Sequence, residues 1–106
     1  MEKWLMIIGS NSKDAKREAE FNDWYDKIHI PDVLSIPDFK KATRYQIMGG
    51  PKGEEGKYLA IYEIATTDIK KTMEAHAGNM ARVRGSGRFS ELFQRSFRYI
   101  CKGENY

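Results

Sequence analysis

Four residues with chemically versatile side chains lie within a short part of the chain: Tyr25, His29, Asp32 and Arg44. An unperturbed imidazole titrates near pH ~6.5, so His29 can accept and donate a proton at neutral pH. Tyr25, one helical turn earlier, could donate a hydrogen bond to a carbonyl or phenol oxygen of a ligand. Asp32 could orient the imidazole, and Arg44 could hold a carboxylate or an enolate. These residue types predict acid–base catalysis on a small molecule.

A helix over about residues 13–29 is expected to position the tyrosine and the histidine. Its apolar residues recur at i, i+3, i+4 and i+7, which is one face of a helix; they are Phe21, Trp24, Tyr25 and Ile28. Pro31 lacks the N–H that a continuing helix needs, and it disfavours the α conformation at Ile30. We therefore expect the helix to end near His29 and to leave the imidazole at its rim. Residues 31–36 can form one further short turn, because proline suits a first helical position.

Three aromatic residues near this group predict the wall of a ligand site. Trp24 belongs to the helix, whereas Phe39 precedes and Tyr45 lies within a strand that we expect over about residues 40–48. This strand also carries Arg44, so it would return the guanidinium towards the end of the helix. Alternating residues of a strand face opposite sides, so Arg44 and Tyr45 point in different directions.

The same residues also fit a structural interpretation, which stays open. In that case His29 would bond a backbone carbonyl at the end of the helix. Arg44 would then pair with Asp26 or with Asp32 rather than with a ligand. Residue types and spacing alone do not separate this alternative from a ligand site.

A second histidine, His76, falls within the apolar stripe of a helix expected to begin at residues 66–68 and to end at residues 85–87. The other members of the stripe are Ile69, Met73, Met80 and Val83. A single histidine in such a stripe is usually a core or rim residue with its hydrogen bonds satisfied. The alternative is that His76 lines a cavity and contacts the ligand.

The C-terminal third of the chain is basic, with only Glu91 as a nearby acid. Its basic residues are Arg82, Arg84, Arg88, Arg95, Arg98 and Lys102. One interpretation is a solvated face with ion pairs to the acidic first helix. The other is an anion site, which requires these side chains to converge.

Length and composition indicate one domain over residues 1–106, and the net charge of +3 does not require a nucleic-acid or membrane partner. No apolar run approaches the ~20 residues of a membrane span, and no secretion signal is recognisable. Cys101, the single cysteine, excludes an internal disulfide and is expected in the core. We therefore expect a cytoplasmic location. His29 and His76 have no metal-ligand spacing, so we expect neither a metal nor another cofactor.

The order of elements is β-α-β-β-α-β, with strands expected over about residues 3–8, 40–48, 57–64 and 95–102 and a glycine-rich hairpin loop over 49–56. This order predicts the ferredoxin-like class of α+β proteins: a four-stranded antiparallel sheet with two helices on one face. The strands are apolar on both sides, so the open face of the sheet needs a cover. The economical cover is a second copy, giving a two-fold homodimer.

Residues 21–39, followed by Arg44 and Tyr45, resemble the signature of EthD-like proteins, which belong to the dimeric α+β barrel superfamily. The matching motifs are Trp24-Tyr25, His29-Ile30-Pro31, Leu34, Pro37-Asp38-Phe39 and Arg44-Tyr45. Asp38 replaces the usual glycine of the turn. The resemblance implies a homodimer whose two sheets pack together, with a small-molecule pocket between helices and sheet in each subunit.

We interpret the chain first as a cofactor-independent enzyme that isomerises, cyclises or dehydrates a small cyclic or aromatic carbonyl compound. A non-catalytic ligand-binding or accessory protein with the same pocket is the first alternative. A monooxygenase, either cofactor-free or haem-dependent, is the second, because the resemblance extends to barrels of both kinds. Fold membership does not choose among these reactions.

Overall fold

The computed structural model describes residues 1–50 and 57–105, so most of the predicted glycine-rich loop lies outside the described residues. The strands are β1 (Glu2–Ser12), β2 (Phe39–Gln46), β3 (Tyr58–Thr66) and β4 (Phe93–Lys102). The helical elements are η1 (Ala15–Arg17), α1 (Glu18–Trp24), η2 (Tyr25–His29), α2 (Ile30–Val33) and α3 (Ile69–Gly85). The order matches the one expected from the sequence.

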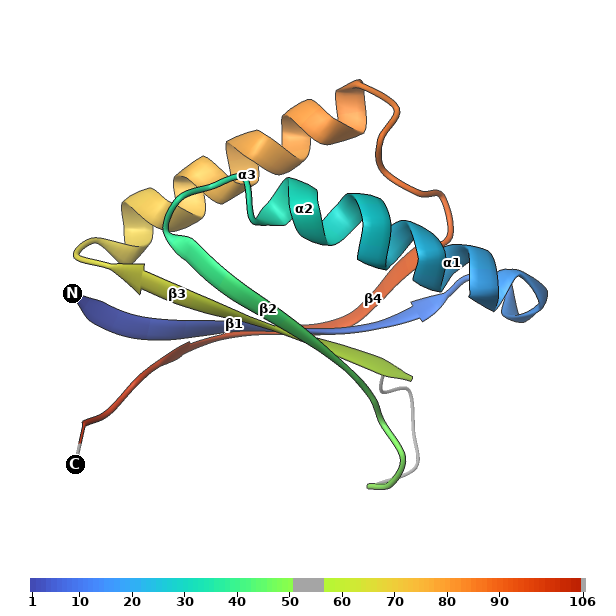
Figure 1. Ribbon diagram of the computed structural model, residues 1–106, viewed down its shortest axis with the longest axis horizontal. Helices are drawn as coiled ribbons and strands as arrows, with labels where there is room; N and C mark the ends of the chain where they lie inside the picture. The colour runs from blue at the N-terminus through green and yellow to red at the C-terminus, as the bar shows by residue number, and fades with distance from the viewer. Residues whose placement is uncertain (51–56, 106) are drawn as a thin grey trace.

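The four strands form one antiparallel sheet in the order β2-β3-β1-β4, with β1 pairing with both β3 and β4. Within residues 1–50 and 57–105, all helices lie on one face of this sheet and none on the other (Figure 1). The ferredoxin-like α+β prediction is therefore confirmed. Among the described residues, no helix combines the length and the apolar character that crossing a bilayer requires.

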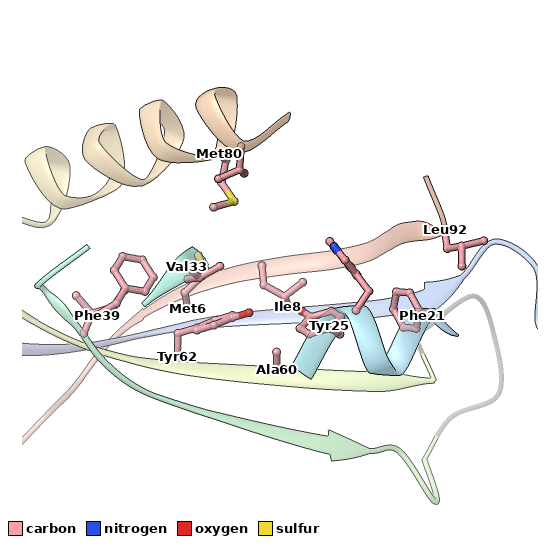
Figure 2. Packing of buried hydrophobic residues seen from close by; sticks show 13 residues of the cluster. Met6, Ile8, Phe21, Tyr25, Val33, Phe39, Ala60, Tyr62, Met80 and Leu92 are labelled. Carbon is pink, nitrogen blue, oxygen red and sulfur yellow. The ribbon is translucent and has the colours of Figure 1, made fainter. Parts of the chain in front are cut away.

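Alternation along the central strands separates the two faces. Met6 and Ile8 of β1 are buried beneath the helices, whereas Ile7 between them is half-buried on the open face. Figure 2 shows Val33 and Met80 pointing from their helices towards Met6 and the other side chains of the sheet. Burying such side chains contributes about 1.5–3 kcal/mol each, and this packing holds the helices against the sheet.

The first helix does not end at His29, contrary to the prediction. Helical backbone continues through Pro31 to Val33, and Ile30 has α-helical angles of φ −60° and ψ −48°. The backbone N–H of Ile30 donates to the carbonyl of Tyr25, five residues earlier, so η2 is a wide π-helical turn. Where such a turn returns to α geometry one carbonyl lacks a donor, and Pro31, which has no N–H, fits there.

The open face of the sheet carries several large side chains exposed to solvent. Tyr45 is 50 % exposed and Tyr99 is 59 % exposed. Cys101 is also exposed on this face, so its predicted place in the core is wrong for the single chain. The open face is therefore apolar and aromatic, without a helix to cover it.

Candidate functional site

A cavity of about 60 Å³ lies between the helices and the sheet. Its lining side chains come from β1, η2, α2, β3, α3, β4 and the segment before β4; they are Met6, Ile8, His29, Val33, Tyr62, His76, Met80, Arg84, Phe89, Phe93, Arg95 and Arg98. Both histidines of the chain are in this set. The structure thus brings together two imidazoles that are 47 positions apart in the sequence.

His29 reaches the cavity from the π-helical turn η2. Its side chain is only 7 % exposed. The ring of Trp24 stacks on it with centroids 4.8 Å apart and 21° between the planes, and Tyr25 meets it edge-on at 4.8 Å. Among the described residues, none makes a hydrogen bond to the His29 imidazole. The aromatic rings therefore fix the orientation of the imidazole and leave its nitrogens available.

His76 enters the cavity from α3. Phe39 stacks on its ring with centroids 5.1 Å apart and 22° between the planes. Its Nδ1 atom is buried and has no hydrogen-bond partner among the described residues. A buried polar atom without a partner is costly, so this nitrogen is a candidate contact for a ligand.

Both imidazoles are neutral at pH 7. Burial lowers the pKa of His29 to about 4, with the neighbouring His76 acting in the same direction. Burial also lowers the pKa of His76 to about 4, assisted by the positive charges of Arg98 and Arg84. A low dielectric environment disfavours the charged imidazolium, which explains both shifts. Each ring can therefore act as a proton acceptor at neutral pH.

Three arginines share the cavity with the histidines, and all three belong to the basic segment for which the sequence left open a solvated face or an anion site. Arg84 comes from α3, whereas Arg95 and Arg98 come from β4. A β-bulge explains the latter pair, because Gly9 is opposite Phe97 while Ser10 is opposite Arg95. The extra residue between them reverses the alternation, so two side chains three positions apart share one face.

Three of the predicted catalytic residues do not line the cavity. Arg44 donates hydrogen bonds to Asp26 at 2.9 Å and to Asn22 at 3.0 Å, as the structural interpretation anticipated. Its guanidinium also lies 4.1 Å from the ring centroid of Tyr25, whose side chain is completely buried. These contacts make Tyr25 and Arg44 supports of the wall behind His29.

Asp32 is bound to another partner. Its carboxylate accepts hydrogen bonds from Arg88, with Nε at 2.9 Å from Oδ2 and the terminal Nη2 at 2.9 Å from Oδ1. No hydrogen bond joins Asp32 to His29 among the described residues, so the predicted orienting contact is not formed. Arg88 lies 56 positions further along the chain, and this pairing had no sequence signal.

The aromatic residues predicted to form a wall divide into two groups. Trp24 and Phe39 back the two imidazoles, one each, although neither lines the cavity itself. Tyr45 lies on the open face of the sheet, because it follows Arg44 in β2 and the strand alternates. Phe89 and Phe93 provide the aromatic lining instead, and sequence analysis did not identify either.

The fold and this cavity define a small ferredoxin-like α+β protein with a pocket between its helices and its sheet. The chain belongs to the family described as "Domain of unknown function (DUF4286)", whose sequence pattern matches residues 12–99. No curated protein matched the chain. Among the described residues no group of three or more His, Cys, Asp or Glu side chains could hold a metal ion.

Two crystal structures show the same fold. HapK from Hahella chejuensis superimposes with a TM-score of 0.68 at 12 % identity, covering 97 % of this chain and 92 % of its own. An ethyl tert-butyl ether D (EthD) family protein from Bacillus halodurans gives 0.53 at 18 % identity, with complete coverage of both chains. At these identities the similarity concerns the fold, and it confirms the predicted structural relation to EthD-like proteins.

Proposed function

We propose that this protein binds a small carbonyl compound in the cavity and transfers protons to and from it, with His29 as the principal acid–base group. The observation that supports this proposal is a pair of neutral imidazoles that face one cavity from two separate helical elements, with His29 buried and His76 half-buried. The reaction class is isomerisation, cyclisation or dehydration without a cofactor. We place the protein in the cytoplasm.

The proposed step begins with the neutral imidazole of His29. It accepts a proton from the carbon next to the carbonyl group and becomes an imidazolium, while the electron pair of the broken C–H bond forms an enolate. The same proton then returns to a different carbon, either from His29 or through His76. The buried position of His29 limits its contact with water, which strengthens the attraction between imidazolium and enolate.

The other predicted residues act by supporting His29 in this proposal. Stacking on Trp24 and the edge contact with Tyr25 hold the imidazole in one orientation. Arg44, placed over Tyr25, keeps that ring in position. Asp32 ties α2 to the segment after α3 through Arg88 and so closes one side of the site.

Hydrogen–deuterium exchange tests the proposal without the natural substrate. Cyclobutanone and cyclopentanone are each incubated with the protein in D₂O, and the loss of the α-proton signals is followed by NMR. We expect the wild-type protein to accelerate exchange of at least one ketone. His29→Gln should slow that exchange by about a hundredfold or more, and His76→Gln should slow it to a smaller extent.

Lys27→Gln is the matched control, because Lys27 is an exposed neighbour of His29 in the same turn and pairs with Asp23. It should exchange protons at the wild-type rate. Equal rates for His29→Gln and wild type would refute the assignment of His29. Saturable ligand binding without exchange of any ketone would favour the ligand-binding protein, and consumption of oxygen would favour the monooxygenase.

We further propose a homodimer formed through the open face of the sheet. Ile7 and Ile61 lie opposite each other at the centre of this face, flanked by Tyr99 on β4. These side chains are half-buried or exposed in the single chain and would be covered by a second copy. A two-fold arrangement suits this surface because an apolar patch can pack against itself.

A further inference from the structure

We propose that the cavity recognises a carboxylate on its ligand through Arg84, Arg95 and Arg98. This inference rests on the proposed function, since it names the class of compound that the same cavity takes: a small organic acid. The geometry that carries it is the convergence of three guanidinium-bearing side chains from α3 and β4 on one small cavity.

The β-bulge is the device that makes this convergence possible. In a regular strand Arg95 and Arg98 would lie on opposite faces, and one of them would point to the open side of the sheet. Because the register shifts between Gly9 and Ser10, Arg98 pairs with Ile8 and Arg95 pairs with Ser10. Ile8 and Ser10 both face the helices, so both arginines do so as well. Bulges often redirect side chains next to binding sites.

None of the three arginines has an acidic partner among residues 1–50 and 57–105. By contrast, Arg17 pairs with Glu20 and Glu91, Arg44 pairs with Asp26, and Arg88 pairs with Asp32. The guanidinium carbon of Arg84 lies 4.6 Å from the ring centroid of Phe89, so this arginine contacts an aromatic face instead of a carboxylate.

Arg84, Arg95 and Arg98 are exposed residues, so solvent screens their mutual repulsion, and an anion in the cavity would neutralise part of their combined positive charge. Both histidines experience the same field, because Arg84 lowers the pKa of each. The guanidinium group is suited to a carboxylate, which it binds with two parallel hydrogen bonds. The unpartnered Nδ1 of His76 offers a further polar contact within reach of the same cavity.

The size of the cavity limits the ligand. Since a cavity needs about 10–15 Å³ to hold one water molecule, 60 Å³ has room for about four to six small groups. A carboxylate with a short or cyclic carbon stem fills such a space. A neutral amide of the same shape would fit equally well but would lack the charge.

The test compares cyclopropanecarboxylate with cyclopropanecarboxamide, which have the same number of non-hydrogen atoms. Binding to the full chain is measured by NMR titration of backbone amide signals at low ionic strength. We expect the carboxylate to bind at least about tenfold more tightly than the amide, and Arg98→Gln to weaken carboxylate binding by about tenfold. Arg98→Gln should leave amide binding unchanged.

Two variants provide the controls. Arg17→Gln removes an arginine that is already paired with acids, and it should bind the carboxylate as the wild type does. Arg98→Lys keeps the charge and should retain more affinity than Arg98→Gln, which guards against a simple folding defect. Equal affinity for acid and amide, an unchanged carboxylate affinity of Arg98→Gln, or tighter binding of inorganic phosphate than of the carboxylate would overturn the inference.

The same titration separates this inference from the proposed proton transfer. His29→Gln should keep the preference for the acid over the amide, because the charge recognition does not involve His29. If proton exchange is absent but this preference holds, the proposed reaction fails and the carboxylate site stands. If neutral ketones exchange protons but the acid binds no more tightly than the amide, the carboxylate site fails and the proposed proton transfer stands.

Discussion

Acidification should destabilise this fold in a way that His29→Gln partly removes. The pKa of His29 falls from its ordinary value of 6.5 to about 4 in the folded chain, because the ring is buried and faces His76. Asp32 opposes this shift, whereas Arg44 and Arg84 add to it. The unfolded chain therefore takes up a proton at a higher pH than the folded chain. Stability is complete above about pH 6.5 and declines as the pH falls towards 4.

The size of the effect follows from the two pKa values. One pKa unit corresponds to about 1.4 kcal/mol, so the maximal loss from His29 alone is about 3 kcal/mol. At pH 5 most of this loss is already expressed, and we expect about 2 kcal/mol. His76 should add a smaller amount, because its side chain is less completely buried.

Urea unfolding of wild type and His29→Gln at pH 7.5 and pH 5 measures the stability that each protein loses on acidification. The difference between these two losses is the contribution of His29. The substitution itself changes stability at both pH values, so only the change between them reports the titration. We expect the wild type to lose about 2 kcal/mol more than the variant over this interval. NMR titration of the imidazole protons gives an independent reading. A pH dependence shared by both proteins, or a His29 midpoint near 6.5, would refute the reasoning.

Three further predictions concern packing and assembly. Gly9→Ala should lower the free energy of unfolding in urea by about 1–3 kcal/mol, because a Cβ atom at Gly9 would overlap the ring of Phe97. Gly78→Ala, at an open position inside α3, should instead raise it by about 0.5–1 kcal/mol. Equal effects of the two substitutions would contradict this account. Arg44→Gln should cost about 1–3 kcal/mol, since its partners are protein groups, yet leave carboxylate binding unchanged; weaker ligand binding would return Arg44 to the site. Ile7→Lys should give a monomer of 12.3 kDa by light scattering where the wild type gives twice that mass, with Lys70→Glu on α3 as the control; a monomeric wild type would exclude the proposed dimer.

The fold could be predicted because its information is local. Short runs that are apolar on both sides indicated the strands, and the spacing of Phe21, Trp24 and Tyr25 indicated the buried face of the first helix. Pro31 misled the prediction for a physical reason. The rule that proline ends a helix assumes α geometry throughout, whereas the π-helical turn shifts the hydrogen bonds and accommodates the missing N–H.

The site could be predicted only in part because its remaining members depend on long-range geometry. His29 was identified from residue type and its place beside Tyr25, and His76 was kept as an alternative. The sequence does not indicate which of several basic residues pairs with Asp32, and the folded chain places Arg88 beside it. Arg95 and Arg98 share a face only because one residue of β4 is left out of the pairing with β1. Neither the Asp32–Arg88 pair nor the β-bulge can be recognised from the residues next to it in the sequence.

Among the described residues, five buried side-chain atoms have no hydrogen-bond partner: Ser10 Oγ, Tyr25 Oη, Arg44 Nε, Tyr62 Oη and His76 Nδ1. Burial raises the pKa of Tyr25 and of Tyr62, and the two hydroxyls influence each other, yet neither meets the geometry of a hydrogen bond. A buried polar atom without any partner costs about 1–3 kcal/mol, so a ligand contact to Nδ1 of His76 would recover free energy.

Two of these groups, on Tyr62 and His76, belong to side chains that line the cavity. A polar ligand that enters the cavity can satisfy them and so recover free energy that the empty protein lacks. Since three unpaired arginines and two neutral imidazoles line the same space, the recovered interactions include charge as well as hydrogen bonds. In the proposed carboxylate site, a ligand that is both anionic and hydrogen-bonding would satisfy both kinds of group together.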